Sequence, residues 1–264
     1  MPELAAIMET TRPLRVSVVI PVYANAGSLA RLCARIAATM RDHRLDHEII
    51  FVDDASPDDS WTRIEALAQS RPGVRGLRHG GNRGQHRAAL AGLGDADGDI
   101  CVVMDADLQD PPEAIPALLR ALRTRDSDVV FAGRVGDYQA WHRMLTSRLY
   151  RRLVLAPMTG LPGDAGMFFA IRRDALDRLL AMTTPGTPML IGMIAAAKLR
   201  CLSVPVMRES RPHGSSAYSG WRRLRAAMRM VRSAWFARPS EEAPLRSQQL
   251  AAIVARSGEA GRRE

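Results

Sequence analysis

This chain is constrained most by a repeated unit in which an apolar segment ends in polar or turn-forming residues and an amphipathic segment follows. The segment 15–23 (RVSVVIPVY) predicts a strand, and the residues after it predict a helix over about 28–42. The segment 47–56 (HEIIFVDDAS) repeats the pattern with a helix through about residue 68, and the segment 99–105 (DICVVMD) begins another unit. Further elements are expected at 74–78 (strand), from about 85 (helix), at 111–122 (helix) and at 127–134 (strand). Strands that alternate with helices predict an α/β fold with a doubly wound, mostly parallel sheet.

The length of 264 residues and a hydrophobic content of 47% indicate one large domain with a sizeable core. We expect a loose leader at 1–14, a single domain at 15–238 and a flexible tail at 239–264. After residue 135 the alternation is weaker. The elements expected there are a basic amphipathic helix at 138–155, a strand and a helix within 163–176, an edge or return strand at 202–207 and a helix at 221–235.

The positive charge of the chain is concentrated in one region. The formal net charge is +9, and residues 200–238 contain nine arginines against one acid, Glu209, a local balance of +8. A basic region favours an anionic partner, which can be nucleotide phosphates, an anionic membrane surface or nucleic acid.

The compartment is indicated by what the sequence lacks. No apolar run reaches the ~20 residues that span a bilayer, and no secretory segment precedes the first strand. The three cysteines are far apart and show no metal-ligand spacing, which favours reduced, buried thiols. We therefore expect a cytoplasmic protein, either free or resting peripherally on the inner face of the membrane.

Polar residues follow several of the predicted strands. They are Pro21–Asn25, Asp53, Asp54, Asp105–Gln109 and Arg134. Because ligands of doubly wound sheets bind beyond the carboxyl ends of the strands, these residues predict a single site. The sequence contains neither the dinucleotide fingerprint G-x-G-x-x-G after its first strand nor a P-loop, so a bound nucleotide would be held in another way.

The D-x-D sequence formed by Asp105 and Asp107 suggests that a metal ion holds the phosphates of a bound nucleotide. Its carboxylates are hard oxygen ligands that suit Mg²⁺ or Mn²⁺, which complete their coordination with substrate phosphates and water. A metal there would neutralise a departing diphosphate, as transfer from a nucleoside diphosphate sugar requires. Asp53, at the end of another strand, is suited to accept a hydrogen bond from a nucleobase N–H. On its own, a D-x-D sequence is more often a solvated turn, and the combination with Asp53 and the strand pattern favours a site.

Four segments resemble successive motifs of the family 2 inverting glycosyltransferases, which have the GT-A fold. They are VSVVIPVYANAGSL, EIIFVDDASPDDS, NRGQHRAALAG and GDICVVMDADLQDPPE. The chain looks most like the polyprenyl-phosphate glycosyltransferases, which include dolichol-phosphate mannose synthases and undecaprenyl-phosphate sugar transferases. GQHRAALAG most resembles the formamido-arabinose transferase branch, which uses UDP-sugars. The resemblance covers about 15–236 and implies a nucleotide-sugar half at 15–134 and an acceptor and membrane-facing half at 135–238.

The resemblance also implies a role for each residue that matches a motif. The implied nucleotide-sugar contacts are Pro21, Tyr23, Asn25, Asp53, Gly84, Gln85 and Asp105. The implied ligands of Mg²⁺ or Mn²⁺ are Asp107, Asp105 and Gln109, and the implied catalytic residues are Asp107, Asp164 and Arg134. The acceptor phosphate is implied to lie near Arg134, Arg211, Ser216 and Tyr218, the last three within the family pattern R-x-x-G-x-S-K-Y.

Two positions depart from the family pattern. Phe169 stands where the family often has arginine, and Ala217 stands where it has lysine. Both family cations are expected to face the phosphates of donor or acceptor. Their loss leaves the acceptor open and suggests a different anion clamp, for which we consider Arg172, Arg173 and Arg208. Of these, we expect Arg173 on the acceptor-phosphate side of the site.

The acceptor decides whether a general base is required. A polyprenyl phosphate is already anionic and needs only positioning, whereas a hydroxyl needs a carboxylate within reach, for which Asp164 is the candidate. The helix expected at 221–236 bears on this choice, because tryptophans at both ends and a row of arginines are typical of a helix lying on anionic lipid. The alternative is a helix packed on the domain with a solvated basic face, and the fit with a lipid acceptor favours the membrane.

We therefore expect a metal-dependent inverting glycosyltransferase that moves a sugar from a UDP-sugar to a polyprenyl phosphate. The alternative within the same class is a soluble transferase acting on a hydroxyl or amine of a small molecule or glycan. A nucleic-acid-binding protein is the remote alternative. We expect no nucleic-acid partner, because the basic region lacks an aromatic platform or groove-reading motif.

Overall fold

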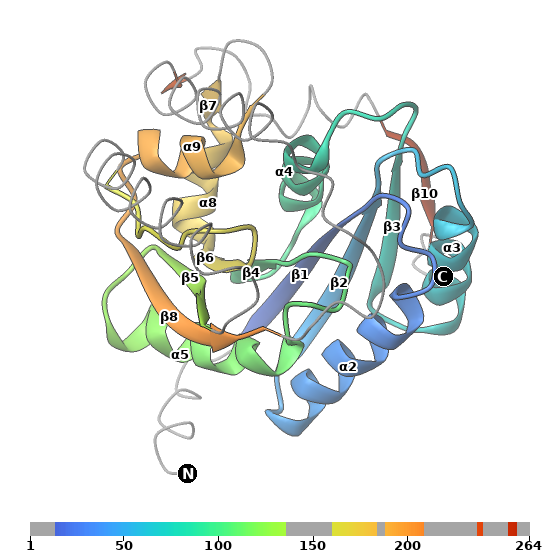
Figure 1. Cartoon of the computed structure of the whole chain (residues 1–264), viewed down its shortest axis with the longest axis horizontal. Helices are drawn as coiled ribbons and strands as arrows, with labels where there is room; N and C mark the ends of the chain where they lie inside the picture. The colour runs from blue at the N-terminus through green and yellow to red at the C-terminus, as the bar shows by residue number, and fades with distance from the viewer. Residues whose placement is uncertain (1–13, 136–159, 184–187, 209–236, 240–252, 258–264) are drawn as a thin grey trace, which may run out of the picture.

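The computed structural model describes residues 14–135, 160–183, 188–208, 237–239 and 253–257 (Figure 1). The first part of this description alternates strand and helix, as the apolar runs predicted. Its elements are β1 (Arg15–Val22), α2 (Leu29–Asp42), β2 (Asp46–Asp53), α3 (Ser60–Ser70), β3 (Val74–His79), α4 (Gln85–Asp95), β4 (Ile100–Val103), the 3₁₀ turn η2 (Pro112–Ala114), α5 (Ile115–Thr124) and β5 (Val129–Val135).

The later elements complete the sheet and its cover. They are β6 (Phe169–Arg172), α8 (Arg173–Leu180), β7 (Met182–Thr183), α9 (Leu190–Ala196), β8 (Cys201–Met207), β9 (Arg238–Pro239) and β10 (Ile253–Ser257). The helices expected at 138–155 and 221–235 lie outside the described residues.

The main sheet has eight strands in the order β10-β3-β2-β1-β4-β6-β5-β8. β1 pairs in parallel with β2 and β4, β2 pairs in parallel with β3, and β5 pairs in parallel with β8. β6 is antiparallel to both of its neighbours, β4 and β5, and β10 is antiparallel to β3. The α/β prediction of a doubly wound, mostly parallel sheet is confirmed, and β8 takes the edge position expected for 202–207.

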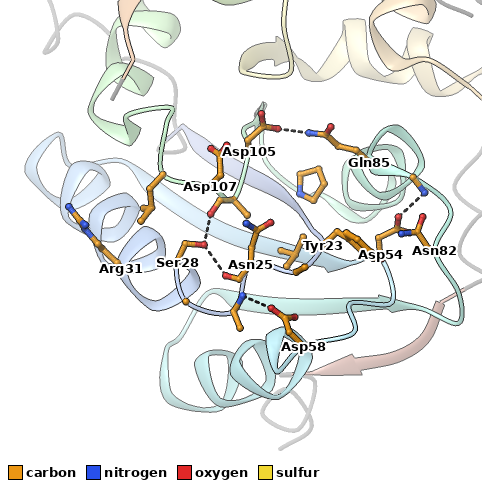
Figure 2. Close-up of a pocket in the computed structure, with 18 residues that line it drawn as sticks. Tyr23, Asn25, Ser28, Arg31, Asp54, Asp58, Asn82, Gln85, Asp105 and Asp107 are labelled. Carbon is orange, nitrogen blue, oxygen red and sulfur yellow. Dashed lines mark hydrogen bonds between the residues drawn. The ribbon is translucent and has the colours of Figure 1, made fainter. Parts of the chain in front are cut away.

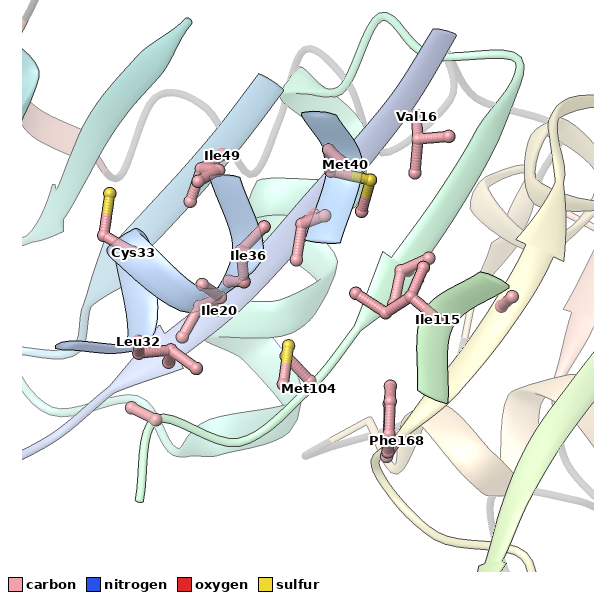
Figure 3. Close-up of a cluster of buried hydrophobic side chains, with 14 of the residues drawn as sticks. Val16, Ile20, Leu32, Cys33, Ile36, Met40, Ile49, Met104, Ile115 and Phe168 are labelled. Carbon is pink, nitrogen blue, oxygen red and sulfur yellow. The ribbon is translucent and has the colours of Figure 1, made fainter. Parts of the chain in front are cut away.

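Helices cover both faces of this sheet (Figure 1). Alternate residues of each strand point to opposite faces, so Val18 and Ile20 of β1 pack with α2, α3 and α5, while Val19 packs with α4. Figure 3 shows the first of these two cores, with Ile36 and Met40 of α2 against the strands. Strands that are buried on both faces need apolar residues at every position, which is why they read as continuous apolar runs.

One helix lies unusually close to the sheet. A Cβ atom added to Gly92 of α4 would lie 2.4 Å from Cγ1 of Val19 and 2.9 Å from Cγ2 of Val52. A side chain therefore does not fit between α4 and the strands β1 and β2. This approach fixes the start of α4, Gln85, relative to the carboxyl ends of the same strands.

The tail differs from the prediction. Within 239–264, expected to be flexible, the segment Ile253–Ser257 forms β10 and pairs with β3, with Ile253 opposite His79 and Ser257 opposite Gly76. An edge strand has unpaired backbone groups that another segment can satisfy, and β3 would otherwise be such an edge.

Candidate active site

A cavity of about 800 Å³ opens at the carboxyl ends of β1, β2 and β4 (Figure 2). Four loops form its walls: loop A (23–28, after β1), loop B (54–60, after β2), loop C (80–85, after β3) and loop D (104–110, after β4). The volume is in the range of small-molecule sites, and the position is where doubly wound sheets bind ligands.

Loop A is held by side chains of loop B. Three consecutive backbone N–H groups of loop A each donate to one side-chain oxygen, so this turn needs no regular structure of its own to satisfy them. The pairs are Ala24 N with Ser56 Oγ at 3.1 Å, Asn25 N with Ser60 Oγ at 3.2 Å and Ala26 N with Asp58 Oδ2 at 3.1 Å.

Loop B is joined to loop C through one buried carboxylate. Asp54 accepts hydrogen bonds from the backbone N–H of Arg83 at 2.8 Å and of Gly84 at 2.7 Å, and its Oδ1 lies 2.7 Å from Nδ1 of His79. Burial raises the pKa of Asp54, and these three donors outweigh it, so the pKa is lowered overall. Gly84 has φ +91°, a conformation that favours glycine, and it begins α4.

Two further side-chain hydrogen bonds complete the connections between the four loops. The amide of Gln85 at the start of α4 donates to Oδ1 of Asp105 in loop D. The hydroxyl of Ser28 at the end of loop A donates to the carbonyl of Ala106 at 2.6 Å. Side-chain hydrogen bonds therefore connect A to B, B to C, C to D and D to A around the cavity, and we call these connections the four-loop ring.

Loop D also meets an arginine from the far edge of the sheet. Arg208 follows β8 and forms two hydrogen bonds to Asp110, Nε to Oδ1 at 2.5 Å and Nη2 to Oδ2 at 2.7 Å. Its Nη1 donates to Oε1 of Gln109 at 3.3 Å, and its Nη2 lies 3.7 Å from Oδ2 of Asp105. Burial alone would lower the pKa of Arg208, but the bonds to Asp110 and the charges of Asp105 and Asp107 raise it overall.

The oxygens of loop D fit a divalent cation. Asp105 and Asp107 line the cavity, and Gln109 adjoins them, its backbone N–H donating to Oδ1 of Asp107 at 3.1 Å. Across the described parts of the chain, no three His, Cys, Asp or Glu side chains gather in a way that could hold a metal by themselves. Two carboxylates and an amide oxygen nevertheless suit Mg²⁺ or Mn²⁺, because these ions take their remaining ligands from phosphates and water.

Most of the predicted nucleotide-side residues come together here. Those lining the cavity are Pro21, Tyr23, Asn25, Gly84, Gln85, Asp105 and Asp107. Tyr23 is half exposed, so one large aromatic side chain is open to a ligand. The lining residues that the motif comparison did not assign include Ser28, Arg31, Asp58 and Asn82. Ser28, Asp58 and Asn82 lie within the quoted motifs, and only their polar character beside the assigned residues could have singled them out.

Asp53 is placed differently from its prediction. Its side chain is fully buried and does not line the cavity; its carboxylate lies 3.3 Å from Nε of Arg78 and accepts a long bond of 3.3 Å from the N–H of Ser56. The neighbouring Asp54 lines the cavity instead. Because the strand ends at Asp53 and Ala55 turns with φ +56°, the second aspartate of the pair faces the site.

The predicted acceptor-side residues are only partly described. Asp164 accepts a hydrogen bond from Ser203 of β8 at 2.7 Å and lies against Gly133, where an added Cβ would be 2.1 Å from Oδ2 of Asp164. Asp164 is not among the cavity-lining residues. Arg134 is described only at its backbone, opposite Val206. Outside the described residues lie Arg211, Ser216, Ala217, Tyr218 and the whole segment 221–236.

Arg173, considered as an anion clamp on the acceptor side, lies at the amino ends of the parallel strands, opposite the end that holds the cavity. It donates through Nε to the carbonyl of Gly98 at 2.9 Å, just before β4 begins. Arg172 also turns away from the cavity, with Nε donating to the carbonyl of Ser127 at 2.9 Å. The reason is that β6 runs antiparallel to β4, so its carboxyl end reaches the amino ends of the parallel strands. Of the three arginines considered, Arg208 is the one beside loop D.

Phe169, where the family often has arginine, belongs to the core. Its side chain is fully buried, and its ring centroid lies 5.6 Å from that of Phe131 in β5. A cation at this point would be buried among apolar groups, so Phe169 does not leave a gap in the site that another residue must fill.

Solved structures confirm the GT-A fold. A mannosyltransferase from Pyrobaculum calidifontis, solved with GDP-Man and Mn²⁺, superposes with a TM-score of 0.60 at 23% identity, covering 84% of this chain and 64% of that one. Glucosyl-3-phosphoglycerate synthase from Mycobacterium tuberculosis, solved with UDP, superposes with a TM-score of 0.61 at 20% identity, covering 91% of this chain and 85% of that one.

Sequence relatives are closer. Undecaprenyl-phosphate 4-deoxy-4-formamido-L-arabinose transferases from Sodalis glossinidius and Proteus mirabilis are 37% and 35% identical to this chain over 210 and 209 residues. The match covers 78% of this chain and 63% of each relative. No helix in the described residues is long and apolar enough to cross a membrane. The model of glycosyl transferase family 2 matches residues 17–180, and the chain therefore belongs to that family.

Proposed function

We propose that this chain transfers a sugar from a nucleoside diphosphate sugar, with UDP-sugars preferred, to a polyprenyl phosphate. The observation that carries the proposal is the cavity at the strand ends, where Asp105 and Asp107 stand beside loops A and C. The names of the sequence relatives, which act on undecaprenyl phosphate, support the acceptor. The solved structures that contain GDP-Man or UDP support a nucleotide-bound donor.

Different residues of the cavity have different roles in an inverting transfer. Tyr23 and Asn25 bind the nucleotide, in a wall that loop B holds in place. Asp107, together with Asp105 and Gln109, would hold Mg²⁺ or Mn²⁺, which neutralises charge on the leaving diphosphate. Arg208 adds a fixed positive charge beside the same carboxylates.

On the acceptor side, Arg134, Arg211, Ser216 and Tyr218 contact the phosphate of the acceptor. That phosphate is already a nucleophile, so no proton acceptor is required. The segment 221–236 lies on anionic lipid and brings the cavity to the inner face of the membrane.

Thermal unfolding with UDP, GDP, CDP or ADP, each with and without Mn²⁺, tests the donor site. A ligand at about 100 times its Kd adds ~2.7 kcal/mol of stability. We expect a metal-dependent rise in Tm with UDP that disappears in Asp107→Ala. Asp46→Ala, which changes an exposed aspartate at the amino end of β2, should keep the rise. Absence of a rise with all four nucleotides would overturn the proposal.

A hydroxyl acceptor is the second candidate, because Ser203 fixes the carboxylate of Asp164 through a 2.7 Å hydrogen bond. With a phosphate acceptor, Asp164→Asn removes no required base, and we expect turnover to fall less than tenfold. With a hydroxyl acceptor, loss of the base should reduce turnover by about 10²–10⁴-fold. Radiolabelled sugar transfer to undecaprenyl phosphate and to glycan acceptors, measured in parallel, separates the two candidates.

A further inference from the structure

Arg208 contacts the oxygens that the metal would need. Of the three expected ligand side chains, Gln109 accepts a hydrogen bond from Arg208 at 3.3 Å, and Asp105 lies 3.7 Å from it. The Arg208 side chain is only 13% exposed, so water screens these interactions weakly. The guanidinium therefore occupies part of the coordination space of a divalent cation at loop D.

Two cations cannot share these oxygens at full strength. An ion bound by Asp105 and Gln109 takes the lone pairs that now face Arg208. The ion and the guanidinium are both positive, so they repel each other when they lie beside the same oxygens. Arg208 must then give up Asp105 and Gln109 while keeping another anionic partner, because an unpaired buried charge is costly.

Asp110 is built to be that partner. Its side chain is 3% exposed and receives both arms of the guanidinium, at 2.5 and 2.7 Å. A two-armed pair fixes the orientation of the arginine as well as its charge. Asp110 thus holds Arg208 independently of Asp105 and Gln109.

We propose that Arg208 is a resident counter-cation of loop D that the metal displaces from Asp105 and Gln109, and that Asp110 is the positioning residue that retains Arg208 during the exchange. The identity of the metal rests on the proposed function.

Substitution of Arg208 and substitution of Asp110, the two partners of one ion pair, should change the affinity for Mn²⁺ in opposite directions. Arg208→Gln removes the competing cation, so the affinity for Mn²⁺ should rise about tenfold. Asp110→Asn removes the holding charge, Arg208 then relies on Asp105 and Gln109, and the affinity for Mn²⁺ should fall about tenfold. Arg208→Lys keeps the charge without the two-armed geometry and should lie between wild type and Arg208→Gln.

The measurement is titration of Mn²⁺ alone into the full chain, followed by the electron paramagnetic resonance signal of the free ion. The matched control is the pair of Arg35 in α2 and Glu113 in η2, which has the same two-armed geometry at 2.9 and 2.7 Å. Arg35→Gln and Glu113→Gln should leave the Mn²⁺ affinity within about twofold of wild type. Arg31→Gln, which removes a cation from the cavity wall, reports the general effect of charge and should give a smaller gain than Arg208→Gln.

Effects of the same sign in Arg208→Gln and Asp110→Asn would overturn the exchange, and so would equal gains in Arg208→Gln and Arg31→Gln. The wild-type response to UDP with Mn²⁺ is scored separately. If UDP raises the Tm but the two variants behave alike, the donor site stands and the exchange fails. If Mn²⁺ binding follows the predicted pattern but no nucleotide binds, the exchange stands and the proposed donor fails.

Discussion

The carboxylate of Asp54 shows how much one side chain contributes to the cavity. Three donors from loop C and β3 converge on it, and they outweigh burial to lower its pKa. A buried acid is stable in its charged form only when its oxygens are satisfied in this way. Asp54 therefore holds the wall from which Gly84 and Gln85 face the ligand.

Asp54→Asn tests this role. The amide replaces one acceptor oxygen with a donor, which leaves one donor to this buried side chain without its acceptor, at a cost of about 1–3 kcal/mol. We expect a lower free energy of unfolding in urea and weaker UDP binding by calorimetry. Asp59→Asn is the control, because Asp59 is exposed and its side chain makes no capping hydrogen bond to α3. Unchanged UDP affinity in Asp54→Asn would contradict the role.

For single residues, the sequence predicts which residue types lie at the site but does not predict which way each side chain points. Two aspartates at the end of β2 were expected at the site, yet Asp53 is buried against Arg78 and Asp54 faces the cavity. The choice depends on where the strand ends and on the left-handed turn at Ala55, with φ +56°. Neither is encoded in the spacing of apolar residues. The serines and the aspartate that hold loop A depend on the same turn.

The helix α4 depends on a residue without a side chain. Gly92→Ala should destabilise the protein by about 1–3 kcal/mol, because the methyl group would overlap Val19 and Val52. Gly94→Ala in the same helix should be neutral or stabilise by up to about 1 kcal/mol, because no atom lies within 4 Å of its Cβ position and alanine favours helix. Urea unfolding of the two variants measures both values, and equal effects would refute the close packing.

Among the elements, the strands β1, β2 and β4 were predictable because burial on both faces requires unbroken apolar runs. The direction of β6 was not predictable, because the run FAIR suits either direction equally. That direction carries Arg172 and Arg173 to the amino ends of the parallel strands, whereas β8 runs parallel to β5 and is followed by Arg208 beside loop D. The pairing of β10 with β3 was missed for a similar reason, since it depends on an edge that exists only in the folded sheet.

At the scale of the whole molecule, the two ends of the parallel strands have different roles. The cavity lies at their carboxyl ends, and a buried ionic network around Glu48 lies at their amino ends. Glu48 is 1% exposed and accepts hydrogen bonds from Ser17 at 2.5 Å, Arg75 at 2.6 Å and the N–H of Asp97 at 2.8 Å. Burial raises the pKa of Glu48, but these partners lower it overall.

Glu48→Gln should lower the free energy of unfolding by about 1–3 kcal/mol at pH 7, because it removes one of the two buried carboxylates that pair with Arg75, which keeps Asp95 at 2.8 Å. Since the pKa of Glu48 is lowered on folding, its contribution is present above its ordinary pKa of about 4.3 and is lost as pH falls below that value. The difference in stability between wild type and variant should therefore shrink from pH 6 to pH 3. Urea unfolding across this range measures it, and a difference that is independent of pH would contradict the assignment. UDP affinity of the folded variant should remain unchanged.

The four-loop ring joins positions that are remote along the chain, since the bond from Ser28 to Ala106 spans 78 residues. Contacts of such long sequence separation require that the intervening chain is already ordered. During refolding, the cavity is thus completed only after β1 to β4 have assembled, and no earlier species offers it to a nucleotide. Nucleotide binding then acts on the native state alone: it slows unfolding and leaves the rate of refolding as it was.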